Sequence, residues 1–258
     1  MTTRAAASLS LVALPDFPLV VEGDDLSSLI LAAVARVPMS LVTGDIVVLA
    51  QKVVSKAEGR SVALADVSPS ARAQELSAIS GKDPREVELM LAESTEILRA
   101  RPGLIVVRHR LGIVMANAGI DRSNVAPDGE ERALLLPLDP DRSCATLRER
   151  LRATTGVEVA TMIIDSLGRA WRSGTVGTAI GVSGMPGLLD LRGRPDLFGR
   201  RLQTSELGLA DEAAAAASLL MGQASERRPV VVIRGLGYDR RDGTAAELLR
   251  PPHLDLFR

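Results

Sequence analysis

Residues 46–60 read IVVLAQKVVSKAEGR and contain the most strand-like run of the chain. The run IVVLA follows Gly44 and is continuously apolar, which is typical of a strand buried on both faces of a sheet. Only three of the 31 basic residues are lysines, and two of them, Lys52 and Lys56, lie here. If the strand continues through QKVVSK, both lysines point to one side with Val54 between them. An edge strand protected by lysine and a phosphate contact both fit this pattern.

The composition limits the class of protein. A chain of 258 residues fits one large domain or two small ones, and with 46% hydrophobic but only 2% aromatic residues its core must be mostly aliphatic. The net charge of -1 offers no electrostatic reason to expect nucleic acid or a membrane surface as partner. The single cysteine, Cys144, excludes an intrachain disulfide and fits a reducing cytosol. We therefore expect a cytoplasmic protein, with Cys144 on a helix face.

Helices and strands alternate along the chain without a regular βαβ repeat, which favours an α+β fold with mixed sheets and flanking helices. The expected helices cover residues 25–37, 68–79, 83–98, 141–156 and 210–221, and the expected strands cover residues 8–13, 45–50, 157–166 and 229–235. Residues 104–121 predict two short strands in a hairpin. We expect Glu86, Glu88 and Glu93 on a solvated helix face and His109 in a solvated turn.

Two acidic residues follow apolar strand-like runs. Asp121 ends VMANAGID, and Asp165 with Ser166 ends TMIIDS. A hard divalent cation needs carboxylate, hydroxyl or amide oxygens held on rigid elements, and these residues offer them. Aspartate is also a common turn residue, so the pattern alone leaves both interpretations open.

A glycine-rich segment spans residues 168–187 and includes GTVGTAIGVSGMPG. It matches neither the P-loop pattern nor GxGxxG, and no P-loop occurs elsewhere in the chain. A loop that offers backbone N–H groups to phosphate and a set of tight turns both remain open for this segment.

Taken together, the ordered segments of the chain resemble one family, the coenzyme F420-0:gamma-glutamyl ligases. The segments that carry the resemblance span nearly the whole chain: LPDF with EGDDL, GDIVVLAQKVVSKAEGR, GIVMANAGIDRSNV, IIDSLGRAWRSGTVGTAIGVSG, LRGRPDLFGRRLQTSELGLADE, MGQASE, VVVIRG and GTAAELLRPPHLDLFR. AQKVVSKAEGR and ANAGIDRSN are the most specific of them.

The resemblance implies a reaction. Such ligases join L-glutamate to the lactyl carboxylate of the deazaflavin precursor F420-0, cleave GTP to GDP and phosphate, and can add a second, gamma-linked glutamate. It also implies Mg²⁺ or Mn²⁺, with K⁺ as a further ion, and an intertwined homodimer. The whole chain, residues 1–258, would form one ligase-like unit with two α+β subdomains and no P-loop.

The resemblance also implies roles for individual residues. Lys56, Asp121 and Asp165 would be catalytic, and the metal would be held by Asp121, Asp165, Ser166 and Gln223. The nucleotide would contact Leu14, Pro15, Asp16, Phe17, Gln51, Lys56, Asn124, Met221, Gly222, Gln223, Ala224, Ser225, Glu226, Arg227 and Arg228. Arg169 or Arg172 is a candidate for holding an anionic substrate group. Lys52 receives no role, so we expect Lys56→Arg to be damaging and Lys52→Arg to be mild.

Two alternatives stand beside this hypothesis. The first is a ligase of the same fold with a different acceptor or amino acid, because the matching segments are mostly those of the nucleotide and the metal. The second is a dimeric nucleotide-binding protein without catalysis, against which the presence of both Asp121 and Asp165 argues.

Overall fold

The computed structural model describes residues 7–123, 125 and 130–255. Its α-helices are α1 (Leu26–Val34), α2 (Gln51–Ala57), α3 (Ala71–Ser80), α4 (Pro84–Ala92), α5 (Pro140–Thr155) and α6 (Leu209–Met221). Its strands are β1 (Ser10–Ala13), β2 (Ile46–Ala50), β3 (Ser61–Ala63), β4 (Ser94–Arg101), β5 (Leu104–His109), β6 (Val114–Ala116), β7 (Arg132–Leu134), β8 (Ala160–Arg169), β9 (Arg172–Ser183), β10 (Leu189–Asp190), β11 (Glu206–Leu207) and β12 (Val230–Arg234). Short 3-10 turns are η1 (Leu64–Asp66), η2 (Asn117–Gly119), η3 (Ala245–Leu248) and η4 (Pro252–Leu254).

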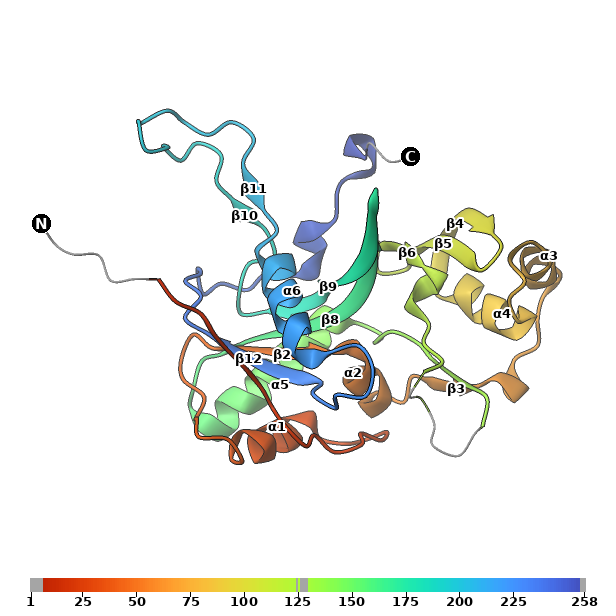
Figure 1. The fold of residues 1–258 in the computed structure, drawn as a ribbon, viewed down its shortest axis with the longest axis horizontal. Helices are drawn as coiled ribbons and strands as arrows, with labels where there is room; N and C mark the ends of the chain where they lie inside the picture. The colour runs from red at the N-terminus through yellow and green to blue at the C-terminus, as the bar shows by residue number, and fades with distance from the viewer. Residues whose placement is uncertain (1–6, 124, 126–129, 256–258) are drawn as a thin grey trace, which may run out of the picture.

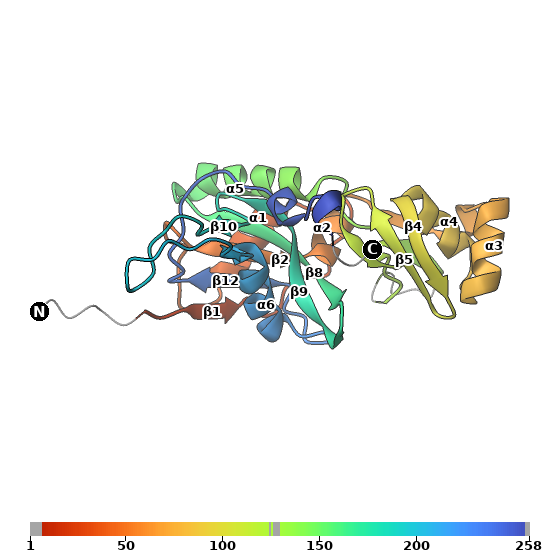
Figure 2. The ribbon, with the colours of Figure 1, turned by 90° about the horizontal axis from the view of Figure 1, so that it is seen from above.

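A five-stranded mixed sheet forms the body of the protein, in the order β1-β12-β2-β8-β9. The apolar run of β2 is its central strand and runs antiparallel to β12 but parallel to β8. Helices α1 and α5 cover one face of the sheet, and α6 covers the other (Figures 1 and 2). Alternate residues of β2 point to opposite faces of the sheet. Val47 and Leu49 pack in one hydrophobic core, and Ile46 and Val48 pack in the other. The predicted α+β class is confirmed.

A smaller region lies at one end of the body (Figures 1 and 2). It contains α3, α4 and the three-stranded sheet β4-β5-β6. Its apolar residues, among them Met90 and Ile105, belong to the same buried cluster as Val47 of the central sheet. The hydrophobic core is therefore continuous between the two regions. The expected division into two subdomains stays a prediction.

The helix boundaries follow from local sequence. The side chains of Asp25, Ser70, Asp83 and Asp139 accept hydrogen bonds from backbone N–H groups in the first turns of α1, α3, α4 and α5. Helix α5 ends at Gly156, whose φ of 72° a side chain would disfavour. Cys144 is buried on α5, as predicted. No helix in the described part of the chain is long and apolar enough to cross a membrane.

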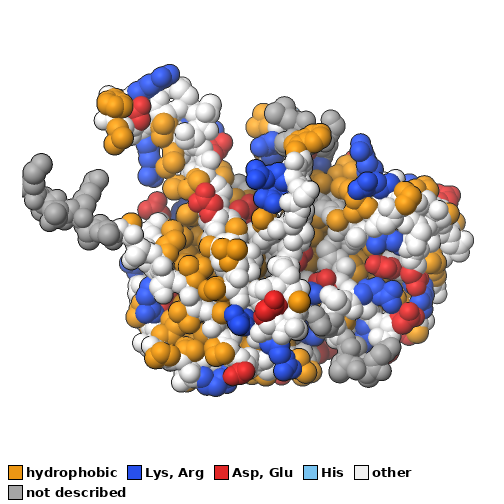
Figure 3. Space-filling view, in the orientation of Figure 1, with side chains coloured by type: hydrophobic (Ala, Val, Ile, Leu, Met, Phe, Trp, Pro, Cys, Tyr) orange, Lys and Arg blue, Asp and Glu red, His pale blue; other side chains and the backbone are white. Residues whose placement is uncertain are grey.

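An arm projects from the body between β9 and α6 (Figure 1). Strands β10 and β11 form its base as a two-stranded antiparallel sheet. Near its end, Leu197 and Phe198 are 98% and 96% exposed, and Figure 3 shows hydrophobic side chains gathered there. The arm has little core of its own and offers apolar surface away from the body.

Two expectations about secondary structure were wrong. The segment QKVVSK is helix α2, not a continuation of the strand, because its valines and Ala57 recur at helical spacing and Val53 and Val54 are buried. The helix from residue 83 ends at Ala92, and residues 94–98 belong to strand β4, where Thr95 and Ile97 are β-branched. Lys52 and Lys56 still share a side, because residues four apart lie on one helix face.

The glycine-rich segment 168–187 is mostly strand β9 rather than loops or turns. A Cβ at Gly177 would lie 2.5 Å from the backbone oxygen of Ala214 in α6, and one at Gly181 would lie 2.6 Å from the backbone of Pro140 in α5. These two glycines let helices approach β9 closely from its two faces. Close packing therefore explains why glycine occupies these two positions. Neither the phosphate-binding loop nor the set of tight turns considered from sequence included this explanation.

Candidate active site

The site is built at the carboxyl ends of two parallel neighbours, β2 and β8. Ala50, the last residue of β2, lies in register with Ile164 of β8. Helix α2 therefore begins beside the point where Asp165 and Ser166 follow on β8. In open α/β sheets, ligands bind outside the carboxyl ends of parallel strands, and the parallel pair β2–β8 offers an edge of the same kind.

Asp121 reaches this point from another part of the chain. The turn before it holds Asn117 and Ala118 at φ 51° and 53°, and backbone hydrogen bonds in both directions tie Asp121 to Leu134. Its Oδ2 accepts a hydrogen bond from Gln51 Nε2 at 2.7 Å, and its Oδ1 lies 3.3 Å from Lys52 Nζ. The first two residues of α2 thus contact both oxygens of the Asp121 carboxylate.

The carboxylates of Asp121 and Asp165 influence each other. Burial and the negative charge of Asp121 raise the pKa of Asp165 to about 6. Burial also raises the pKa of Asp121, although Lys52 and Gln51 oppose it. Two carboxylates that disfavour each other's charge form a site that a cation would stabilise.

Ser166 and Gln223 form a second contact beside the first. Ser166 Oγ donates to Gln223 Oε1 at 2.8 Å, which links β8 to the loop after α6. Among the described residues, no three of His, Cys, Asp and Glu gather to hold a metal. Two carboxylates with a hydroxyl and an amide oxygen nevertheless fit Mg²⁺ or Mn²⁺, which take few protein ligands and complete their shell with phosphate and water oxygens.

A cavity of about 430 Å³ adjoins these residues. Most of the predicted nucleotide residues line it, together with Asp165 and Ser166: Phe17, Gln51, Lys56, Met221, Gly222, Gln223, Ala224, Ser225, Glu226, Arg227 and Arg228. In the loop after α6, Gly222 and Arg227 have φ of 75° and 56°. A left-handed arginine is uncommon and costly, and such residues cluster at binding sites.

Other predicted contacts lie outside the cavity wall. Leu14, Pro15 and Asp16 do not line it. The side chain of Leu14 is in the core, and its N–H donates to Val230 O. The carbonyl oxygens of Pro15 and Asp16 accept from Arg36. Asn124 lies outside the described residues. The nucleotide contacts of these four residues stay predictions.

The two lysines of α2 occupy different surroundings. Lys56 lines the cavity and is half-buried, and burial together with the charge of Lys52 lowers its pKa. Lys52 also lines the cavity, contacts Asp121 and donates to Ser123 Oγ at 3.0 Å. Sequence reasoning missed Lys52, although its spacing of four from Lys56 could have revealed it under a helical interpretation.

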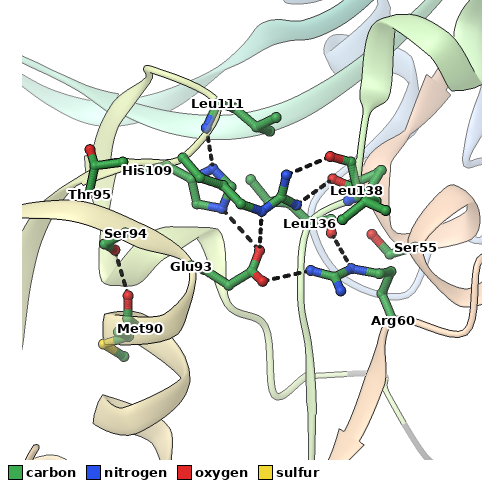
Figure 4. Close-up of polar contacts among 12 residues, drawn as sticks. Ser55, Arg60, Met90, Glu93, Ser94, Thr95, His109, Leu111, Leu136 and Leu138 are labelled. Carbon is green, nitrogen blue, oxygen red and sulfur yellow. Dashed lines mark hydrogen bonds and ion pairs between the residues drawn. The ribbon is translucent and has the colours of Figure 1, made fainter.

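A buried ion-pair cluster holds the other end of α2 in place (Figure 4). Glu93 Oε1 lies 2.8 Å from Arg60 Nη2, and Glu93 Oε2 lies 3.0 Å from Arg110 Nε and 3.4 Å from His109 Nε2. Arg60, just after α2, also donates to Leu136 O at 2.9 Å. The expectations of a solvated Glu93 and a solvated His109 were both wrong. Only the folded chain brings two arginines and a histidine around this glutamate.

Arg169 and Arg172 lie away from the cavity wall, at the tip of the β8–β9 hairpin. Both are exposed, and Arg169 Nη2 donates to Ser173 O at 3.2 Å. Their proposed contact with an anionic substrate stays a prediction.

Comparison with known proteins identifies the family of the chain. Residues 16–235 match the family described as F420-0:Gamma-glutamyl ligase. The coenzyme F420:L-glutamate ligase of Methanothermobacter thermautotrophicus is 47% identical over 97% of this chain and 99% of its own length. The ligase of the same name from Methanopyrus kandleri is 46% identical over 92% of each chain, and that of Archaeoglobus fulgidus is 44% identical over 93% of each. The chain therefore belongs to the F420-0:gamma-glutamyl ligase family.

Proposed function

We propose that this protein uses GTP to join L-glutamate to the lactyl carboxylate of F420-0, in the biosynthesis of coenzyme F420. Its relatives are named for glutamate ligation to F420. The observation that carries the proposal is the approach of Asp121, paired with Lys52, to Asp165, beside a cavity whose wall includes Asp165, Lys52 and Lys56. This combination suits a phosphoryl transfer, in which alignment and charge neutralisation are the main requirements.

In this proposal GTP occupies the cavity, with its phosphates toward the start of α2. Lys56, half-buried in the wall, neutralises phosphate charge, and Gln51 and the loop after α6 surround the rest of the nucleotide. Asp121 and Asp165, with Ser166 and Gln223, hold Mg²⁺ or Mn²⁺, and K⁺ is a further expected ion. A cation held there would supply positive charge that offsets the charge of the nucleotide phosphates.

The chemistry follows from the weak electrophilicity of a carboxylate. A lactyl carboxylate oxygen of F420-0 attacks the γ-phosphorus, the bond from that phosphorus to GDP breaks, and an acyl phosphate results. The glutamate amine then attacks the acyl carbon, phosphate leaves, and the nitrogen gives up a proton. The residues of the site contribute by holding the reacting groups in line. A second, gamma-linked glutamate would repeat the cycle.

We propose further that the protein forms a homodimer in the cytoplasm. The arm with exposed Leu197 and Phe198 supports it, because apolar side chains so far from any core gain from being covered by a second copy. Light scattering of the wild type and of a Leu197→Ser, Phe198→Ser variant tests it, and equal molar masses would reject this role of the arm.

The activity is tested by incubating the purified protein with GTP, Mg²⁺, L-glutamate and F420-0. We expect GDP, phosphate and a product heavier by one or two glutamyl residues. Replacing glutamate by other amino acids, or F420-0 by other acceptors, tests the first alternative, a ligase with different substrates. GTP binding with no turnover under any of these conditions would support the non-catalytic alternative instead.

A further inference from the structure

Trp171, the single tryptophan of the chain, occupies an unusual position. It lies with Ala170 in the two-residue turn between β8 and β9, where Arg169 pairs with Arg172. Its side chain is 90% exposed and its φ is 62°. Glycine or asparagine is the usual choice for such a turn position, since a bulky side chain there is strained. With 90% of its side chain exposed, Trp171 contributes little to the hydrophobic core.

This turn directly follows β8, the strand that contributes residues to the candidate active site. Strand β8 contributes Asp165 and Ser166 and then continues beyond its neighbour β2, whose register with it ends at Ala50 and Ile164. Figure 1 shows the β8–β9 hairpin extending beyond the adjacent strands. Trp171 lies six positions after Asp165, which at about 3.3 Å per residue places the tip roughly 20 Å from the carboxylate.

We propose that Trp171 stacks on the planar deazaflavin ring of the acceptor and that Arg169 and Arg172 face its anionic tail. This inference rests on the proposed function. The acceptor carries its reacting carboxylate at the end of the tail that is far from the ring, so a binding surface for the ring must lie away from Asp165. An exposed indole offers a flat face for an aromatic ring, and the two flanking guanidinium groups suit an anionic chain. The guanine of GTP has the same aromatic chemistry, but the cavity beside α6 already offers the nucleotide a place.

Fluorescence tests whether the acceptor binds near the tip, because all tryptophan emission of the protein comes from Trp171; the KM of Trp171→Gly then separates stacking from energy transfer without contact. Titration of the wild type with F420-0 alone should quench this emission with saturation, beyond the loss seen with a free tryptophan derivative at equal absorbance. Titration with GDP alone should not. Quenching by GDP but not by F420-0, or no saturable quenching by either, would overturn the proposal.

Kinetics separate recognition from folding. Trp171→Gly should raise the KM for F420-0 about tenfold, in keeping with the worth of one aromatic stack, and leave the KM for GTP unchanged. Its melting temperature should be equal or higher, since glycine relieves the strained φ. Trp171→Phe should restore most of the affinity. Leu219→Ala, which removes another exposed apolar side chain, should change neither KM.

The outcomes distinguish this inference from the proposed function. Ligation without quenching, with an unchanged KM in Trp171→Gly, keeps the function and rejects the stacking. Quenching by F420-0 without ligation, with weaker binding of F420-0 to Trp171→Gly than to the wild type, keeps the stacking and rejects the activity. Loss of a dimer in Trp171→Gly, with no quenching in the wild type, would assign the tip to a protein interface and overturn the proposal.

Discussion

Lys52 Nζ lies 3.3 Å from Asp121 Oδ1, so the first turn of α2 supplies a cation to one of the two carboxylates of the site. The ammonium group of Lys52 thereby occupies the neighbourhood in which we propose a divalent metal. From sequence, Lys52 received no role, and this contact now gives a physical reason to expect one.

Replacing Lys52 by glutamine should tighten Mn²⁺ binding in the absence of nucleotide by about tenfold, because a like charge beside the metal is removed. GTP turnover should fall at the same time, since a cation near the phosphates is lost. Electron paramagnetic resonance of free Mn²⁺ measures the first effect. Lys82→Gln, far from the site in sequence and in structure, is the control. Weaker Mn²⁺ binding in Lys52→Gln would contradict the proposed metal position.

Lys56→Arg should reduce kcat for GTP strongly, about a hundredfold, because a larger planar head group does not fit a half-buried position in the cavity wall. Lys52→Arg should also be damaging, since a guanidinium group can hold Asp121 through two hydrogen bonds and keep it from a metal. Steady-state kinetics of both variants check this. A fully active Lys52→Arg enzyme would contradict a role of Lys52 in GTP turnover and leave Lys56 as the lysine of α2 that turnover requires.

Asp165→Asn should lower turnover at least about a hundredfold while the melting temperature stays equal or rises. The amide removes a charge that burial and Asp121 disfavour, so the fold does not depend on it. Asp190→Asn, at an exposed position of β10, should retain activity. An active Asp165→Asn enzyme would exclude Asp165 from the metal site.

Glu93→Gln should destabilise the protein by about 3 kcal/mol at pH 7, because a buried carboxylate loses its charge beside two arginines. Burial raises the pKa of Glu93, but His109, Arg60 and Arg110 outweigh burial and lower the pKa to about 2 from 4.5. Since the folded-state pKa is the lower one, this stability is present above pH 4.5 and is lost as the pH falls toward 2. Urea unfolding at pH 7 and pH 3 should show the difference between wild type and variant shrinking. A difference that is independent of pH would contradict the charge-based explanation.

Gly181→Ala should destabilise the protein by about 1–3 kcal/mol, since its Cβ would lie 2.6 Å from the backbone of α5. Gly168→Ala is the matched control, because a Cβ there meets nothing within 4 Å, and it should stay within about 0.5 kcal/mol of wild type. Denaturant midpoints of the two variants check this. Equal stability of both would show that β9 can move away from α5.

Several features were predictable from sequence because they depend on neighbours along the chain. Asp25, Ser70, Asp83 and Asp139 begin helices through bonds to residues two or three positions away, and the apolar run of β2 is buried on both faces. The ordered segments also indicated the family, which the comparisons show. Chemically suited residues, Asp121 and Asp165 among them, were identifiable by type and position at the end of apolar runs.

Only the tertiary structure decided how these residues meet. Asp121 and Lys52 are 69 positions apart, and Ser166 and Gln223 are 57 apart, so no local pattern reports their contacts. The same holds for the burial of Glu93 and His109 and for the glycines of β9, whose reason is the close approach of α5 and α6. Local sequence determines backbone conformation through short-range hydrogen bonds and periodicity, whereas charge pairing, burial and close packing depend on which distant elements share a surface.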